Sequence, residues 1–292
     1  MIRPIFLTSL LFAASLGLAL AQDTSLPLVG SVETIADQAG IDARTGAYDQ
    51  PVWVQNRPFS TTRVHIQRNP YEWGVEQWVR SRENGGDWKF RIQEEISLGL
   101  PHRIQLDFYY DWTIEDSKAD HLDYSGEIRW APADWGVIPL NPAFYFEYKF
   151  TDASRGGDVI EPKILLGEDF GDGWHWGMNF IYERELGGGS AEEWAISQAI
   201  SHAIFNDDCS IGMEMKWTRE TSRGQRDHPE QKFALGPNFQ WRPNAKTYLT
   251  LAALGGTTGA TPDFEGWFVF GYIFGTPTTG QSKRLGVVSG RR

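Results

Sequence analysis

The chain contains very little cysteine and no long apolar stretch after its first residues. Cys209 is the only cysteine in 292 residues, which excludes the internal disulfide framework that holds many small exported domains together. After residue 21 there is no run of about 18 apolar residues, so the mature chain is not expected to cross a membrane as helices. Basic residues are also few, and the formal net charge is −11. Without a basic stripe, nucleic acid is not expected as a partner.

The first residues have the pattern of an export signal. Arg3 precedes an apolar run over residues 5–20, which ends in Ala19-Leu20-Ala21 before the polar Gln22. A signal-peptidase site typically has a small residue at the last position before the cleavage and another one two positions earlier. The alternative, an N-terminal membrane anchor, is disfavoured because the run is shorter than the roughly 20 residues that a spanning helix needs. We therefore predict a signal peptide over residues 1–21.

From residue 72 onward the dominant pattern is the alternation of apolar and polar residues, which predicts strands rather than helices. In residues 104–112 every second position is apolar, and the residues between them are mostly polar or charged. Residues 88–100 follow the same pattern except at Glu94, where a β-bulge at Glu94-Glu95 would remove the conflict. Similar runs, from a first strand over residues 72–80 to a last one over residues 264–274, predict about twelve strands.

Tryptophans near the strand ends and the spacing of the connections favour a membrane barrel over a soluble β-sandwich. Short connections are expected at 101–102, 171–173, 206–208 and 243–244. Long connections are expected at 81–87, 115–121, 152–158, 187–192, 221–230 and 255–263, on the opposite side of the membrane, with 131–139 as a long loop on the short-turn side. The predicted fold is all-β: a transmembrane antiparallel up-and-down β-barrel of about twelve strands over residues 72–274.

Two extensions flank this predicted barrel. Residues 22–71 lack sustained alternation and are expected to form a periplasmic extension or a plug that enters the lumen. Residues 275–292 are polar and are expected to remain a tail, because they contain too little apolar surface to fold alone.

The alternating strands, the tryptophan positions and the last strand ending in Phe274 resemble the bacterial outer-membrane β-barrel proteins of the porin and channel class. This resemblance implies a Gram-negative outer-membrane location, contact with outer-membrane lipid, and insertion by the outer-membrane assembly machinery. Residues 56–62 and 73–76 are also similar to the opening of transporters grouped with the phenol-degradation MetA pathway. The resemblance leaves the oligomeric state open.

An outer-membrane hydrolase is the enzymatic alternative, and it would need a nucleophile, a base and an orienting group in contact. Ser201-His202 is the only adjacent candidate pair, but neighbouring residues of a strand point to opposite faces. The acidic turns lack the spacing of a calcium loop, and the adjacent glutamates lack the geometry of a glycosidase. We therefore predict no enzyme activity, no cofactor and no metal site.

The polar face of the predicted strands carries both charge signs and is expected to line the lumen. The candidate lumen residues are Lys89, Arg91, Glu95, Arg103, Asp107, Asp111, Glu127, Arg129, Glu147, Lys149, Lys163, Glu183, Glu214 and Lys216. They could form cross-strand pairs, such as Arg91 with Asp111 and Asp107 with Arg129, that only make the wall rigid.

A barrel of about twelve strands is wider than side chains alone can fill. We therefore expect a channel or porin-like transporter for small polar solutes or ions. A structural or surface-interaction barrel without flux is the alternative. A ring of carboxylates near mid-height would give a cation preference; its expected members are Glu95, Asp107, Glu127, Glu147 and Glu214.

Overall fold

A computed structural model describes residues 46–115, 118–152, 154–171, 173–187, 189–205 and 208–275. The predicted signal peptide, residues 22–45 of the N-terminal extension, and the tail from residue 276 lie outside the described residues. The described elements are one short helix, α3 (Val52–Gln55), and twelve strands: β1 (Trp73–Asn84), β2 (Asp87–Leu100), β3 (Ile104–Glu115), β4 (Lys118–Trp130), β5 (Ala143–Thr151), β6 (Asp158–Asp169), β7 (Trp174–Leu186), β8 (Glu192–Ile204), β9 (Cys209–Thr221), β10 (Glu230–Asn244), β11 (Thr247–Gly256) and β12 (Phe264–Phe274).

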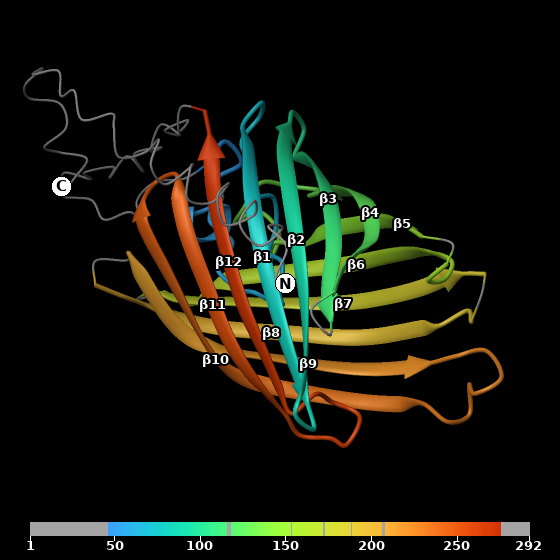
Figure 1. Ribbon diagram of the computed structural model, residues 1–292. Coiled ribbons are helices and arrows are strands. Elements are labelled where there is room, and N and C mark those ends of the chain that lie inside the picture. Colours follow the sequence, from blue (N-terminus) through green and yellow to red (C-terminus); the bar gives the residue numbers. More distant parts are fainter. Residues whose placement is uncertain are drawn as a thin grey trace, which may run out of the picture. The chain divides into compact units, whose positions relative to one another are not determined.

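The twelve strands close into a barrel in which each strand pairs antiparallel with its neighbours in sequence (Figure 1). β1 pairs with β12 from Trp73 opposite Phe274 to Glu83 opposite Phe264, which closes the sheet. The predicted all-β, up-and-down barrel of twelve strands is therefore confirmed. No helix within the described residues is long and apolar enough to cross a membrane.

One predicted connection between strands is wrong in length, and another has the predicted length and side. We call the end where β1 begins and β12 ends the proximal end, and the opposite end the distal end. At the distal end, the predicted long connection over residues 81–87 is a turn of only Gly85 and Gly86 between β1 and β2. Both glycines have positive φ, 59° and 98°, which the tightest hairpin turns require. The long connection over residues 131–142 lies at the proximal end, the side to which the loop over residues 131–139 was predicted to belong.

The wall is apolar outside and polar inside, because side chains alternate between the two faces of each strand. Phe108 on the outer face is 58 % exposed, whereas its neighbour Asp107 on the inner face is fully buried. The predicted bulge at Glu94-Glu95 is wrong: β2 stays in regular register with β1 and β3 there. Glu94 therefore faces outward, where it accepts a hydrogen bond from Trp112 Nε1 at 3.1 Å. That indole donor explains how an outward carboxylate is accommodated without a bulge.

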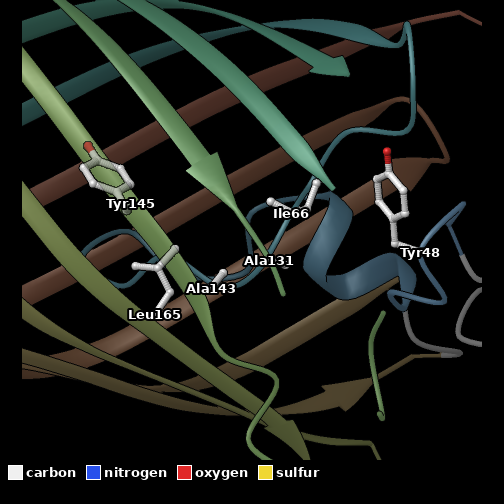
Figure 2. Packing of buried hydrophobic residues seen from close by; sticks show 6 residues of the cluster. All are labelled: Tyr48, Ile66, Ala131, Ala143, Tyr145 and Leu165. Atoms are coloured by element: carbon white, nitrogen blue, oxygen red, sulfur yellow. The ribbon is translucent and has the colours of Figure 1, made fainter. Parts of the chain in front are cut away.

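Residues 46–70, which we call the inner segment, run inside the barrel against the inward face of the wall. Figure 2 shows Tyr48 and Ile66 of this segment packed near Ala131, Ala143 and Leu165. A second apolar cluster joins the segment to Ala199 of β8. Its members from the segment are Trp53, Val54, Phe59 and Val64. Each such buried side chain contributes roughly 1.5–3 kcal/mol, so the segment has an apolar core of its own.

Two glycines on neighbouring strands, β6 and β7, leave space for a side chain of this segment. Gly167 and Gly177 are cross-strand partners. A Cβ atom at Gly167 would lie 2.3 Å from Val64 Cγ1, and one at Gly177 would lie 2.8 Å from Val64 Cγ2. Side chains at either position would collide with Val64, so the two glycines form a notch in which it sits.

Candidate lumen site

The inner segment is held first by a buried carboxylate that receives its backbone donors. Glu214 of β9 accepts hydrogen bonds from the backbone N–H groups of Ser60 and Thr61 at 2.8 and 2.7 Å. The Thr61 hydroxyl donates to the same carboxylate at 2.7 Å, and the Asn238 amide donates at 3.1 Å. Buried backbone N–H groups need partners, and here one wall side chain supplies them. Glu214 therefore fixes the inner segment at Ser60 and Thr61.

Wall amides hold the rest of the segment backbone. Asn179 of β7 makes a two-way contact with Arg63, accepting from its N–H and donating to its carbonyl, both at 2.7 Å. Gln105 of β3 accepts from two successive N–H groups of the segment at 2.9 and 3.1 Å. Gln240 of β10 donates to two successive carbonyl groups at 2.6 and 2.9 Å. An extended stretch inside a barrel has no neighbouring strand to bond its backbone N–H and C=O groups, and these side-chain amides bond them instead.

Three arginines of the segment converge on two carboxylates of the wall. Arg57 lies 3.0 Å from a carboxylate oxygen of Glu76 and 3.6 Å from one of Glu95. Arg63 approaches Glu95 at 2.9 Å, and Arg68 approaches Glu76 at 3.5 Å. Both carboxylates are fully buried, so each needs this positive charge to remain ionised. The segment thus neutralises the acidic side chains of β1 and β2.

A second buried charge cluster lies on β3 and β4. Arg129 pairs with Asp107 at 3.2 Å and with Glu127 at 2.7 Å. It also donates to the backbone carbonyl of His65 at 3.1 Å, which ties the cluster to the segment. The predicted ion pairs of Arg129 with Asp107 and of Arg91 with Asp111 therefore both form. They are diagonal rather than directly opposite in register.

His65 is the titratable imidazole of the inner segment, which is not itself a membrane-spanning strand. Its side chain is buried and packs edge-on against Trp135. Desolvation by this burial lowers the pKa of His65 to about 4. The imidazole is therefore neutral near pH 7.

These contacts change the expected role of the acidic ring. Glu95, Asp107, Glu127 and Glu214 are buried and bonded to arginine, to tyrosine or to the inner segment. They do not face an open path, so the expected ring of free carboxylates is wrong for four of its five members. Glu147 alone lines the remaining cavity.

That cavity, about 290 Å³ in volume, lies on the distal side of the inner segment. Its floor is formed by the segment around residues 57–63, and its wall comes from several strands. Eight basic and five acidic side chains line it. They are Arg57, Arg63, Arg80, Arg82, Arg91, Lys149, Lys163 and Lys216, with Glu147, Glu161, Glu183, Glu193 and Glu265. The lining is therefore richer in positive charge than the chain as a whole.

The structure separates the fourteen candidate lumen residues into three groups. Six line the cavity: Arg91, Glu147, Lys149, Lys163, Glu183 and Lys216. Six are buried deeper in the wall or beside the segment: Glu95, Asp107, Asp111, Glu127, Arg129 and Glu214. Lys89 and Arg103 lie at the distal and proximal rims, where they pair with Glu115 and Asp134. The candidates are thus not one continuous lining.

Sequence reasoning missed the residues that shape the cavity floor. Arg57 and Arg63 come from the extension, where no periodicity marked them. Trp78 and Arg80 share the inward face of β1 with Glu76, and Trp267 is the cross-strand partner of Arg80. The spacing of two from Glu76 is the sequence signal that could have placed Trp78 and Arg80 on the inward face.

A hydrolase-like arrangement appears on β6, β7 and β8 that sequence reasoning also missed. His175 Nδ1 lies 2.8 Å from Asp169 Oδ1, and Ser201 is the cross-strand partner of His175. Trp53 of the inner segment stacks on the His175 ring with centroids 4.6 Å apart. Within the described residues Ser201 Oγ makes no hydrogen bond. The same described part contains no cluster of three or more histidine, cysteine or acidic side chains arranged to hold a metal ion.

The chain matches no known family model, and no curated protein matches it by sequence. Solved structures do resemble its fold. The COG4313 outer membrane channel from Pseudomonas putida F1 is 9 % identical, with a TM-score of 0.52 over 72 % of this chain and 98 % of that one. The NanC porin is 12 % identical, with a TM-score of 0.49 over 70 % of this chain and 100 % of that one. The KdgM porin in complex with oligogalacturonate is 8 % identical, with a TM-score of 0.45 over 70 % and 99 %.

At these identities the likeness concerns the fold. The chain has the fold of bacterial outer-membrane β-barrel proteins, which confirms the resemblance predicted from its strands. The outer-membrane location predicted from the sequence agrees with this fold and with the apolar outer face of the wall.

Proposed function

We propose that the protein is an outer-membrane channel for small polar solutes, in which the inner segment closes the proximal half of the lumen. The observation that carries the proposal is the charged cavity enclosed by a closed twelve-strand wall. An apolar outer face suits contact with lipid, and a polar interior suits a hydrated path. Insertion by the outer-membrane assembly machinery is part of the same proposal.

The inner segment suits a gate because many of its contacts are polar. When the segment moves, its hydrogen bonds and ion pairs can be replaced by contacts with water. A covalent link could not be replaced in this way. The segment is continuous with β1 at Trp73, so one end stays fixed while residues 46–70 leave the lumen. Flux then requires displacement of the segment.

The same packing favours the second candidate, a structural barrel without flux. If the segment never leaves, its buried residues are simply the core of the barrel. The two functions differ in whether a folded barrel with a releasable segment conducts ions.

We further propose that the protein is not an enzyme, despite the Asp169 and His175 pair. The Ser201 hydroxyl makes no hydrogen bond to a base within the described residues, and Trp53 covers the imidazole. A hydrolase needs nucleophile and base in contact and a substrate within reach. Ser201→Ala should leave conductance unchanged.

A reversible lock on the inner segment tests the channel proposal. Thr62 Oγ1 and Ser197 Oγ lie 3.1 Å apart, so Thr62→Cys with Ser197→Cys can form a disulfide between the segment and β8. Cys209→Ser removes the native thiol. In planar bilayers the reduced double variant should conduct, and oxidation should reduce its conductance severalfold.

Each single cysteine variant is the matched control, and oxidant should not change its conductance. A reduced protein that is shown to be folded but never conducts would contradict the channel proposal and favour the structural barrel. Equal conductance before and after oxidation would keep the channel and reject the segment as its gate.

A further inference from the structure

Arginine side chains and two tryptophans gather at the floor and on one wall of the distal cavity. The Arg57 guanidinium lies 3.1 Å from the ring centre of Trp78, and that of Arg63 lies 4.8 Å from the same ring. Arg80 lies 5.3 Å from the ring centre of Trp267, which packs edge-on against Trp78 at 6.0 Å. These three arginine–tryptophan contacts bring three guanidinium groups to one side of the cavity.

Each of these guanidinium groups has a donor without an acceptor. Within the described residues, Arg57 Nε, Arg63 Nη1 and Arg80 Nε are buried and make no hydrogen bond. Arg57 is 1 % exposed and Arg63 is 6 % exposed. An unsatisfied buried donor is costly, and a cluster of three on neighbouring residues indicates a missing acceptor.

The neighbouring carboxylates do not supply that acceptor: Arg63 Nη1 lies 3.9 Å from Glu76, which is beyond hydrogen-bond distance. Glu265 pairs with Arg82 at 2.5 Å, and Asp111 pairs with Arg91 at 2.7 Å. Within the described part of the chain, the Arg80 side chain makes no ion pair and no hydrogen bond, and its direct cross-strand partner is Arg91. Like charges directly opposite on a sheet destabilise it. A bound anion would remove this conflict and occupy the unused donors.

We propose that the distal cavity binds the oxyanion group of a small organic anion, a carboxylate or a phosphate, between Arg57, Arg63 and Arg80. Guanidinium groups present paired N–H donors that match both of these oxyanions. Trp78 and Trp267 border the site and offer apolar surface to the organic part of the solute. The inference rests on the proposed channel function and names the solute class that the channel would take. It also makes the inner segment a part of the binding site, because two of the three arginines belong to it.

Binding can be measured apart from conductance. We would titrate refolded full-length protein in a zwitterionic detergent and low chloride, by calorimetry, with sodium acetate and with inorganic phosphate. We expect at least one of the two to bind, and the stronger one identifies the oxyanion. Glycerol, which has no charge, should not bind.

Arg80→Gln is the decisive variant because, within the described chain, Arg80 makes no hydrogen bond and no ion pair that its loss would break. It should weaken anion binding roughly 10- to 100-fold, the effect of losing one charge-assisted hydrogen-bonding group. Arg80→Lys keeps the charge but not the paired donors and should lie between wild type and Arg80→Gln. Arg184→Gln is the matched control: this arginine faces Glu192 and lies outside the cavity lining, so its loss should leave binding unchanged.

The inference is overturned if folded wild type binds neither anion, or if Arg80→Gln binds as tightly as wild type. Conductance without anion binding would reject this site and leave the channel proposal standing. Anion binding that depends on Arg80, in a protein that never conducts, would support the site and reject the channel.

Discussion

The proximal and distal halves of the lumen are built from the same strands but use their charged residues differently. In the proximal half the wall carboxylates are buried and are neutralised mainly by the inner segment and Arg129. In the distal half, lysines and glutamates pair across the strands around an open cavity, as Lys149 does with Glu183. The difference shows that the position of a charge on the inward face does not decide its role. The role of a charged residue is decided by whether the inner segment or an open cavity lies beside it.

One assay can compare the two halves. A cysteine at Val54, which is fully buried and does not line the cavity, is expected to become reactive only when the inner segment opens. With Cys209→Ser as background, the labelling rate by a thiol reagent reports the free energy of that opening. Four substitutions then probe the contrast, from the largest expected effect to the smallest.

Glu214→Ala should have the largest effect, because it removes the acceptor of two backbone N–H groups in the proximal half. Leaving such buried donors unsatisfied costs roughly 3 kcal/mol, or about 100-fold faster labelling. Glu183→Ala in the distal half is the control and should cost less than about 1 kcal/mol, since its ion pair is partly solvated. Equal rates in the two variants would contradict the distinction between the halves.

Gly177→Leu should come next, because its side chain would occupy the notch of Val64. Overpacking of this kind costs roughly 1–3 kcal/mol and should displace the segment from β6 and β7. The labelling rate should rise, and conductance should rise with it if the segment is the gate. Gly126→Leu is the control, since a Cβ atom there meets only Phe108 at 4.0 Å. Unchanged labelling in Gly177→Leu would show that the notch does not position the segment.

Acidification should favour opening of the inner segment by a smaller free energy, because His65 becomes protonated. Burial lowers its pKa to about 4, whereas an exposed imidazole titrates near 6.5. The state in which the inner segment has left the wall therefore binds the proton more readily. As a result, binding of the segment to the wall is strongest above pH 6.5 and weakens as the pH falls toward 4. Between pH 7.5 and 5 the change should be about 1–2 kcal/mol.

Labelling rates at each pH would be divided by those of a small reference thiol, to remove the effect of thiol ionisation. His65→Gln should lose most of the pH dependence. If that variant keeps the full dependence, other groups control the opening.

Lys216→Gln should have the smallest effect. Its ammonium lies 3.3 Å from Glu193 in the distal half, and both side chains are partly exposed. Such pairs contribute less than about 1 kcal/mol, so labelling should stay within about fivefold of the parent. A larger change would mean that the distal pairs also hold the inner segment.

Much of the wall was predictable because side-chain direction in a strand alternates strictly. The pattern over residues 104–112 was enough to assign Phe108 outward and Asp107 inward, and the number of such runs was enough for twelve strands. The ion pairs of Arg91 and Arg129 followed from the same faces, although the register differs because turn geometry sets it. The predicted long connection between the first two strands failed, because two adjacent glycines allow a two-residue hairpin turn.

By itself, then, the sequence determined the strands, their two faces and the class of fold, since these depend on local alternation. Only the tertiary structure decided which inward residues face a cavity and which are buried beneath Arg57, Arg63 and Arg68. The reason is that the inner segment has no periodic pattern, and its contacts with Glu76, Glu95 and Glu214 join residues far apart in the chain. Such contacts depend on closure of the barrel around the segment, which no local pattern encodes.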